Sequence, residues 1–165
     1  MSTLYTNRLV LRPFKEEDAQ AVYKNWTYDE RVAKYCRWYP HKSVEDTVGY
    51  LKMCCINAEY CWAITLKEND EPIGAIDLVD DNEIGYVLAY DYWGKGIVTE
   101  AVKAVIEELF NCGFEKISAC HAIDNPASGK VMEKCGMTYV RNRMALKKFG
   151  SDELCEVKYY EISRP

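Results

Sequence analysis

A strand-like stretch runs into a helical one through two glycines, Gly94 and Gly96, in the segment 92–101. Glycine has no Cβ, so a ligand can approach the backbone of such a turn closely. The N–H groups of the first helical turn are free, and the helix macrodipole favours negative charge beside them. The turn therefore predicts a binding site for a phosphate or a pyrophosphate.

Two well-known phosphate loops do not fit this turn. A P-loop needs four residues between its glycines and then Gly-Lys-Ser/Thr, and a Rossmann turn needs three glycines spaced G-x-G-x-x-G. Here Ile97 and Val98 follow Gly96. Residues 93–98 resemble instead the acetyl-CoA pyrophosphate loop of the GNAT superfamily of N-acetyltransferases, Q/R-x-x-G-x-G/A. Trp93 replaces Gln or Arg, and the bulkier Val98, which would crowd the pyrophosphate, replaces the last Gly or Ala.

A second block strengthens the resemblance. Residues 124–137 are similar to the superfamily's N-x-A-S-x-x-V-x-E-K-x-G-M/F segment, the helix that flanks the pantetheine arm of acetyl-CoA. The opening 6–14 and the closing 159–165 extend the resemblance over the whole chain. The Trp-Gly-x-Gly loop and the C-terminal motif resemble those of the ribosomal-protein alanine N-acetyltransferases.

The resemblance implies acetyl-CoA as co-substrate and no metal. The residues that it assigns to acetyl-CoA are Val87, Leu88, Trp93, Gly94, Lys95, Gly96, Ile97, Val98, Thr99, Asn125 and Ser128. In this superfamily the parallel strands that match 83–90 and 116–122 splay apart, and their unpaired backbone groups hold pantetheine as an extra strand would. Small residues, Gly85 and Ala89, suit that arrangement, and a bulge or a packing accommodation is the alternative reason for Gly85.

The length of 165 residues, with 48% apolar and 28% charged residues, predicts one domain, residues 1–165. Hydrophobic spacing predicts helices over 16–26, over 44–58, from Val98 to Gly113, and from Pro126 to Gly136 with Asn125 as N-cap. It predicts strands at 9–11, 61–66, 73–79, 83–90, 116–122, 137–145 and 154–162. This order indicates an α+β fold, the single-domain GNAT fold, with one mixed central sheet of about seven strands, splayed parallel strands and flanking helices.

The formal charge of −5 and the lack of clustered basic residues argue against a nucleic-acid partner. An acidic surface suits a cationic substrate, or it only keeps the protein soluble. No run of about 18 apolar residues and no signal peptide is present, which predicts a cytoplasmic protein without a membrane partner. The eight cysteines form no C-x-x-C pair and are expected to be reduced core residues.

Acetyl transfer needs a base for the amine, a donor to the carbonyl oxygen and a proton for the departing thiolate. By resemblance, a backbone N–H near Leu88 is the oxyanion donor. Glu83 is similar in position to the glutamate base of histone acetyltransferases, and a solvated strand-end carboxylate is the alternative. His121 is the second candidate base, or else a hydrogen-bonded core residue. Many relatives carry a tyrosine acid where this chain has Met132, so Ser128 is the remaining side-chain donor.

The resulting prediction is an acetyl-CoA-dependent N-acetyltransferase that moves an acetyl group to a primary amine by direct attack in a ternary complex. The amine is a protein N-terminus or a small molecule. A non-catalytic acyl-CoA-binding sensor is the alternative function. Four aromatic residues shape the acceptor pocket or belong to the core: Trp26, Trp38, Tyr39 and Trp62. The sequence leaves the acceptor amine open, and the chain is expected to be a monomer or a homodimer.

Overall fold

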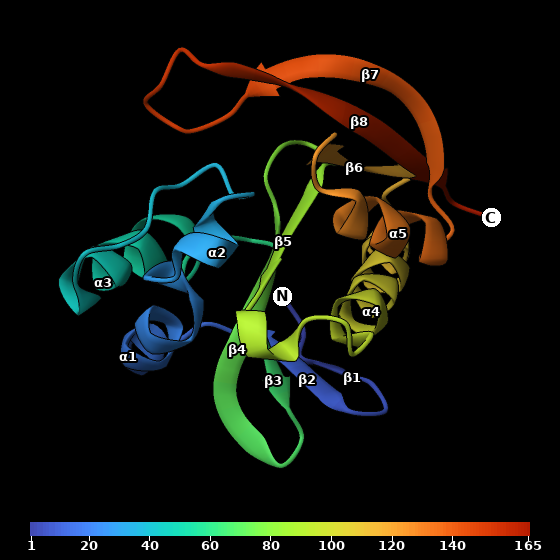
Figure 1. Cartoon of the computed structure of the whole chain (residues 1–165). Coiled ribbons are helices and arrows are strands. Elements are labelled where there is room, and N and C mark those ends of the chain that lie inside the picture. The colour runs from blue at the N-terminus through green and yellow to red at the C-terminus, as the bar shows by residue number, and fades with distance from the viewer.

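The computed structural model describes residues 1–165, in which eight strands form two sheets (Figure 1). The first sheet is antiparallel, in the order β1 (Leu4–Tyr5), β2 (Leu9–Pro13), β3 (Cys61–Leu66), β4 (Asn69–Leu78) and β5 (Ile84–Leu88). The second has the order β6 (Lys116–Ala122), β8 (Leu154–Ser163) and β7 (Thr138–Leu146). The α+β class is confirmed, but two sheets replace the expected single sheet of about seven strands.

The two sheets meet at one parallel bridge, between Glu83 and Ser118. There the Ser118 N–H donates to Asn82 O at 2.8 Å. Beyond the bridge β5 and β6 form no further ladder, as expected for a splayed pair. Splaying is the reason for two sheets, because strands that separate after one bridge cannot continue a hydrogen-bonded ladder. Sequence spacing missed β1 because two residues are too few to show alternation.

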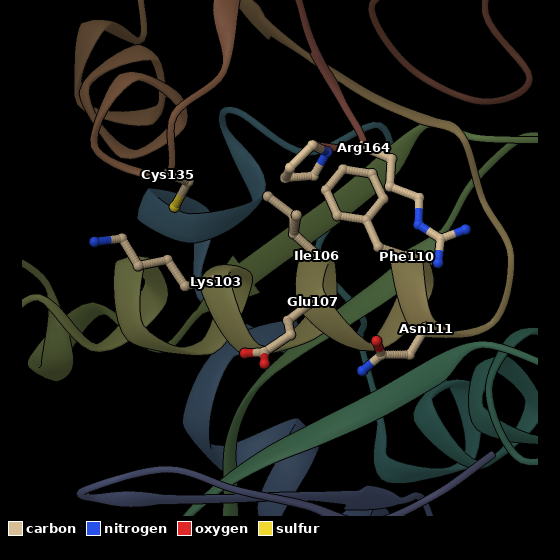
Figure 2. A pocket seen from close by; sticks show the side chains of 8 residues that line it. Lys103, Ile106, Glu107, Phe110, Asn111, Cys135 and Arg164 are labelled. Carbon is tan, nitrogen blue, oxygen red and sulfur yellow. The ribbon is translucent and has the colours of Figure 1, made fainter.

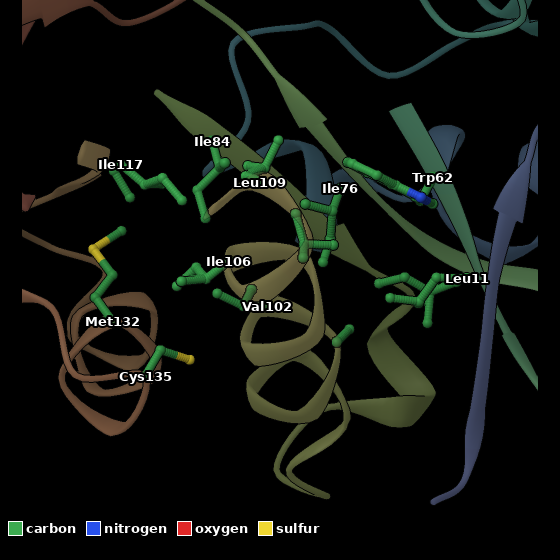
Figure 3. Packing of buried hydrophobic residues seen from close by; sticks show 14 of the residues in the cluster. Leu11, Trp62, Ile76, Ile84, Val102, Ile106, Leu109, Ile117, Met132 and Cys135 are labelled. Atoms are coloured by element: carbon green, nitrogen blue, oxygen red, sulfur yellow. The ribbon is translucent and has the colours of Figure 1, made fainter. Parts of the chain in front are cut away.

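Helix α4 (Ile97–Asn111) connects β5 to β6 and covers one face of the first sheet (Figure 1). Its buried side chains repeat at helical spacing: Ile97, Ala101, Val102, Val105, Ile106 and Leu109. Figure 3 shows this stripe between the sheet and Met132 of α5 (Pro126–Lys134). Both predicted helices are confirmed, and each is followed by a left-handed glycine, Gly113 (φ 98°) and Gly136 (φ 85°).

The opposite face of the first sheet carries α1 (Ala19–Val22), α2 (Glu30–Ala33) and α3 (Val44–Cys54) (Figure 1). Helix α3 begins as predicted after Ser43, whose Oγ accepts a hydrogen bond from Asp46 N–H at 3.2 Å. The predicted helix 16–26 is instead a 3₁₀ turn, α1 and a π-helical turn (Tyr23–Thr27). That turn buries Trp26 at 1% exposure, so tertiary packing overrides the regular helical period.

All eight cysteines are free thiols, but only Cys55, Cys61 and Cys135 are buried. Cys54 and Cys112 are exposed, so the expectation of core cysteines is wrong for them. Both lie at helix ends, where the buried stripe of the helix has finished. Among the helices, none combines the length and apolarity that a membrane crossing needs.

Candidate active site

The glycine turn before α4 presents a row of free backbone donors. Gly94 and Gly96 have φ of 74° and 72°, the left-handed region that favours glycine. The N–H groups of residues 94–99 have no backbone acceptor in the protein, and the first helical bond is from Glu100 N–H to Gly96 O at 3.1 Å. The turn itself is exposed to solvent. An open row of donors at a helix N-terminus fits the pyrophosphate that the sequence predicts.

One cation, Arg8, lies beside this turn. Arg8 Nη1 donates to Lys95 O at 2.9 Å, and its Nη2 lies 3.7 Å from the position that a Cβ on Gly96 would take. Glu100, in the first turn of α4, accepts from Arg8 Nε at 2.7 Å. The positive charge of Arg8, although paired with Glu100, adds to the attraction of the helix dipole for an anion. Sequence reasoning missed Arg8 because no local pattern links it to the turn.

Trp93 and Val98, the two departures from the superfamily pattern, leave the donor row open. Trp93 Nε1 donates to Leu88 O at 2.8 Å, and its ring lies 4.9 Å from the Tyr90 ring. The indole therefore ties the turn to the end of β5. Val98 is half-buried and packs against the main hydrophobic core. Its side chain points into the protein, so it does not crowd the exposed turn.

The free edge of β5 faces the gap between the sheets. The register with β4 is continuous, and Ala89 N–H donates to Ile73 O at 2.8 Å, so the odd-numbered residues of β5 bond to β4. Because bonding alternates along an antiparallel strand, the even-numbered residues direct their backbone groups toward the gap. The Leu88 N–H therefore points into the gap, whereas the backbone groups of Val87 face β4.

Asn125 and Ser128 lie where α5 begins. Asn125 is the N-cap residue, as predicted, but its side chain makes no cap hydrogen bond, and the Ser128 N–H bonds to the Asn125 carbonyl at 3.2 Å. Ser128 Oγ lies 2.7 Å from the hydroxyl of Tyr86, which also donates to Ser128 O at 3.0 Å. Burial raises the pKa of Tyr86 well above its usual range, so the phenol stays protonated. Sequence reasoning missed Tyr86, whose hydroxyl contacts the first turn of α5 at Ser128.

Glu83 lies at the bridge between the sheets and is only 7% exposed. Arg37 donates to Oε1 at 3.4 Å, and Arg143 donates to Oε2. The Cys120 thiol also donates to Oε1, at 3.4 Å. Glu83 is therefore not a solvated strand-end carboxylate. Both of its oxygens are occupied by charged donors, so accepting a proton requires the loss of an ion pair.

His121 faces α5, and the structure does not bring it together with Glu83. Nδ1 lies 2.8 Å from Ala122 O, and the buried Nε2 has no hydrogen-bond partner. A Cβ on Gly129 would lie 2.6 Å from Nε2, so the ring packs directly against the helix backbone. This is the packing of a core histidine.

Of the four aromatic candidates for the acceptor pocket, two are core residues. Trp26 and Trp62 are 1% and 0% exposed. Trp38 is half-buried, with its ring 5.7 Å from that of His41, and Tyr39 is exposed. Only Trp38 and Tyr39 are therefore accessible to an acceptor.

A surface pocket of about 380 Å³ lies along the second half of α4, between Lys103, Phe110, Cys135 of the segment after α5, and Arg164 near the C-terminus (Figure 2). None of its lining residues belongs to the predicted site. No group of three or more His, Cys, Asp or Glu side chains is arranged to hold a metal ion.

Comparison with known proteins agrees with this geometry. Residues 8–138 match the family described as acetyltransferase (GNAT) domain. The uncharacterized N-acetyltransferase p20 of Bacillus licheniformis is 34% identical over 145 residues, 80% of each chain. A GNAT-family acetyltransferase from Bacillus anthracis has a crystal structure with a TM-score of 0.85 at 27% identity, over 98% of both chains. The spermidine N-acetyltransferase of Vibrio cholerae, solved with CoA and spermine, has a TM-score of 0.78 at 20% identity, over 96% of both chains.

The family match spans far more than half of the chain, and the relative p20 agrees with it over most of its length. The free donor row before α4 and the gap between β5 and β6 supply the features that an acyl-CoA ligand needs. The chain therefore belongs to the GNAT family and is an acetyl-CoA-dependent N-acetyltransferase.

Proposed function

We propose that this enzyme acetylates a primary amine, on a protein N-terminus or a small molecule, by direct attack of the amine on bound acetyl-CoA. The observation that carries the proposal is the row of N–H groups at residues 94–99, which have no backbone acceptor and flank the gap between β5 and β6. Acetyl-CoA supplies an activated acyl thioester. Every other part of the reaction falls to side chains and backbone groups of the chain.

In this proposal the backbone of residues 94–99 binds the pyrophosphate, and Asn125 and the β5 edge at Leu88 contact pantetheine. The free carboxamide of Asn125 supports that role, because it makes no cap hydrogen bond. The Leu88 N–H donates to the carbonyl oxygen as negative charge develops there. The Ser128 hydroxyl is hydrogen-bonded to the Tyr86 hydroxyl, and it orients the leaving sulfur as a hydrogen-bond donor.

The acceptor is proposed to be cationic before it reacts. The formal charge of −5 favours approach of an ammonium group. The spermidine N-acetyltransferase among the structural neighbours supports a small polyamine-like substrate. The resemblance to ribosomal-protein alanine N-acetyltransferases supports a protein α-amine instead. We place the reaction in the cytoplasm, a reducing compartment that suits eight free thiols.

A non-catalytic acyl-CoA sensor is the second candidate. The observation that favours it is the buried Met132 at the position where many relatives have a tyrosine acid. A sensor would bind acetyl-CoA and release no CoA with any amine. An enzyme releases CoA with at least one member of a panel of N-terminal peptides and small amines.

The binding site is tested by Gly96→Glu. The variant adds a carboxylate beside the donor row at φ 72°, and acetyl-CoA affinity should fall more than about 100-fold because like charges repel at short range. Gly150→Glu is the matched control: it adds the same side chain at φ 75°, with no atom within 4 Å of the new Cβ, at the β7–β8 turn. Unchanged affinity in a folded Gly96→Glu variant contradicts the proposed site.

A further inference from the structure

Asp77 lies near the end of β4, between Cys61 of β3 and Gly85 of β5. Side chains alternate across a strand, so Asp77 points to the same face as Ala75, which belongs to the core beneath α1 and α3. This is the face opposite to α4 and α5. This face carries α1, α2 and α3, whereas the proposed acetyl-CoA site lies by α4 and α5, so the proposal has the amine approach β5 from the side of Asp77.

The glycine at position 85 is what lets the Asp77 carboxylate lie against β5. A Cβ on Gly85 would be 3.1 Å from Asp77 Oδ1 and 2.8 Å from Val79 Cγ1. The register between β4 and β5 has no bulge, so the small residue serves packing and not a change of register. The carboxylate consequently sits beside the strand whose free edge lines the gap.

Asp77 has no cationic partner. No ion pair and no side-chain hydrogen bond from a basic group reaches its oxygens, and the side chain is partly open to solvent. Burial raises its pKa to about 6, against the weaker opposing effect of its own backbone N–H. The titratable groups that face it come from the segment after α2, from α3 and from β3: Cys36, Tyr50, Cys54 and Cys61.

Those neighbours stay neutral near pH 7. Burial raises the pKa of Cys36 to about 12, and burial also raises the pKa values of Tyr50 and Cys54. A hydrogen bond to Cys55, followed by burial, raises the pKa of Cys61. None of these neutral neighbours forms an ion pair with the Asp77 carboxylate, so the carboxylate is free to pair with an incoming ammonium group. Glu83 differs, because two guanidinium groups occupy it.

We propose that Asp77 is the general base of the reaction and that Glu83, held by its two arginines, is a positioning residue. The assignment rests on the proposed function, acetylation of an amine. An acceptor that enters as an ammonium gives one proton to Asp77, directly or through one water. The amine lone pair forms the C–N bond, the C–S bond breaks with its electron pair on sulfur, and the second nitrogen proton passes to that sulfur. Asp77 then returns its proton to water.

The test is Asp77→Asn in the full chain with the preferred amine. We expect kcat/KM to fall about 100-fold or more at pH 7, with acetyl-CoA affinity unchanged. The acidic limb of the wild-type pH profile, with a midpoint near 6, should disappear. Gly85→Ala should also lower kcat/KM, since a Cβ displaces the carboxylate while leaving it in the chain. Asp81→Asn, an exposed neighbour in the next turn, is the control and should match the wild type.

Glu83→Gln separates the two carboxylates. If Glu83 positions the segment after α2, Glu83→Gln raises the acceptor KM and keeps the acidic limb. The assignment is overturned if Asp77→Asn keeps the wild-type kcat/KM and the acidic limb of the pH profile. It is also overturned if Glu83→Gln loses the acidic limb while Asp77→Asn keeps it. A wild-type protein that releases no CoA with any amine overturns the proposed function itself, so the two failures are distinct.

Discussion

At the scale of a single residue, the ionised form of Asp77 that the proposed base requires is also the form that destabilises the folded protein. Its folded pKa of about 6 lies above the ordinary value of 3.8, so the folded state holds a proton that the unfolded state has lost between these pH values. The contribution of this group to the free energy of unfolding is therefore fully present below pH 3.8 and is lost as pH rises through 6. The difference corresponds to about 3 kcal/mol when the carboxyl is ionised.

Asp77→Asn should consequently stabilise the protein at pH 8, by about 2 kcal/mol, because it removes a buried charge without changing the shape of the side chain. The gain should shrink as pH falls through 6 and vanish near pH 4. Urea unfolding at several pH values measures it, with Asp81→Asn as the exposed control. A loss of stability at pH 8 would show that the carboxylate has a stabilising partner, and would contradict its unpaired state.

Some residues of the proposed site could be predicted from the neighbouring sequence, and others depend on contacts with distant segments. Gly94 and Gly96 were predictable because a turn that exposes backbone donors at positive φ requires glycine at those positions. Asp77 and Tyr86 were not, because their surroundings depend on strand register and on a helix far along the chain. The same holds for Glu83: its sequence context is acidic and polar, and its two arginines come from segments remote in sequence.

At the scale of elements, the β7–β8 hairpin holds the segment that follows α2. Lys148, just after β7, donates through Nζ to the carbonyls of Ala33 at 2.5 Å, Cys36 at 2.7 Å and Trp38 at 3.0 Å. Burial lowers the pKa of this lysine, the expected effect of removing an ammonium from water. The same segment places Arg37 on Glu83, so the hairpin fixes what we propose to be the acceptor side of the site.

Lys148→Met should loosen this segment. Three carbonyls lose their donor, and an unsatisfied polar group costs about 1–3 kcal/mol, enough to raise the acceptor KM about 10-fold. Acetyl-CoA affinity should not change, because the donor row before α4 is untouched. Lys147→Met is the matched control, since Lys147 is paired only with the exposed Glu153. Steady-state kinetics with the preferred amine measure the effect, and equal KM values for the two variants would refute the role of the hairpin.

Element prediction succeeded where one apolar stripe repeats over several turns, as in α3, α4 and α5. It failed for the early helices, because α1 and α2 have only four residues each and show less than two turns of periodicity. The strand order near the gap was predictable from the resemblance. The division into two sheets arises because only a single bridge joins β5 and β6, and the spacing of residues in the sequence does not predict where such a bridge ends.

At the scale of the whole molecule, the two sheets share one bridge, and the proposed place of acetyl-CoA is the gap beyond it. A ligand that contacts β5, α4 and α5 together would link both halves of the fold. Because such a ligand binds only the folded state, it must raise the free energy of unfolding by an amount set by its concentration and affinity.

Acetyl-CoA at about 100 times its Kd should stabilise the wild-type protein by about 2.7 kcal/mol, a rise in Tm of about 5–10 °C for a chain of this size. Gly150→Glu should show the same rise, because its new side chain lies away from the donor row. Gly96→Glu should show almost no rise at that concentration. Its Tm without ligand is compared with that of Gly150→Glu, because both variants place a side chain at a similar positive φ. A thermal scan with and without acetyl-CoA measures all three proteins. An equal rise in Gly96→Glu would place the ligand away from the glycine turn, since binding there cannot survive a carboxylate beside the pyrophosphate.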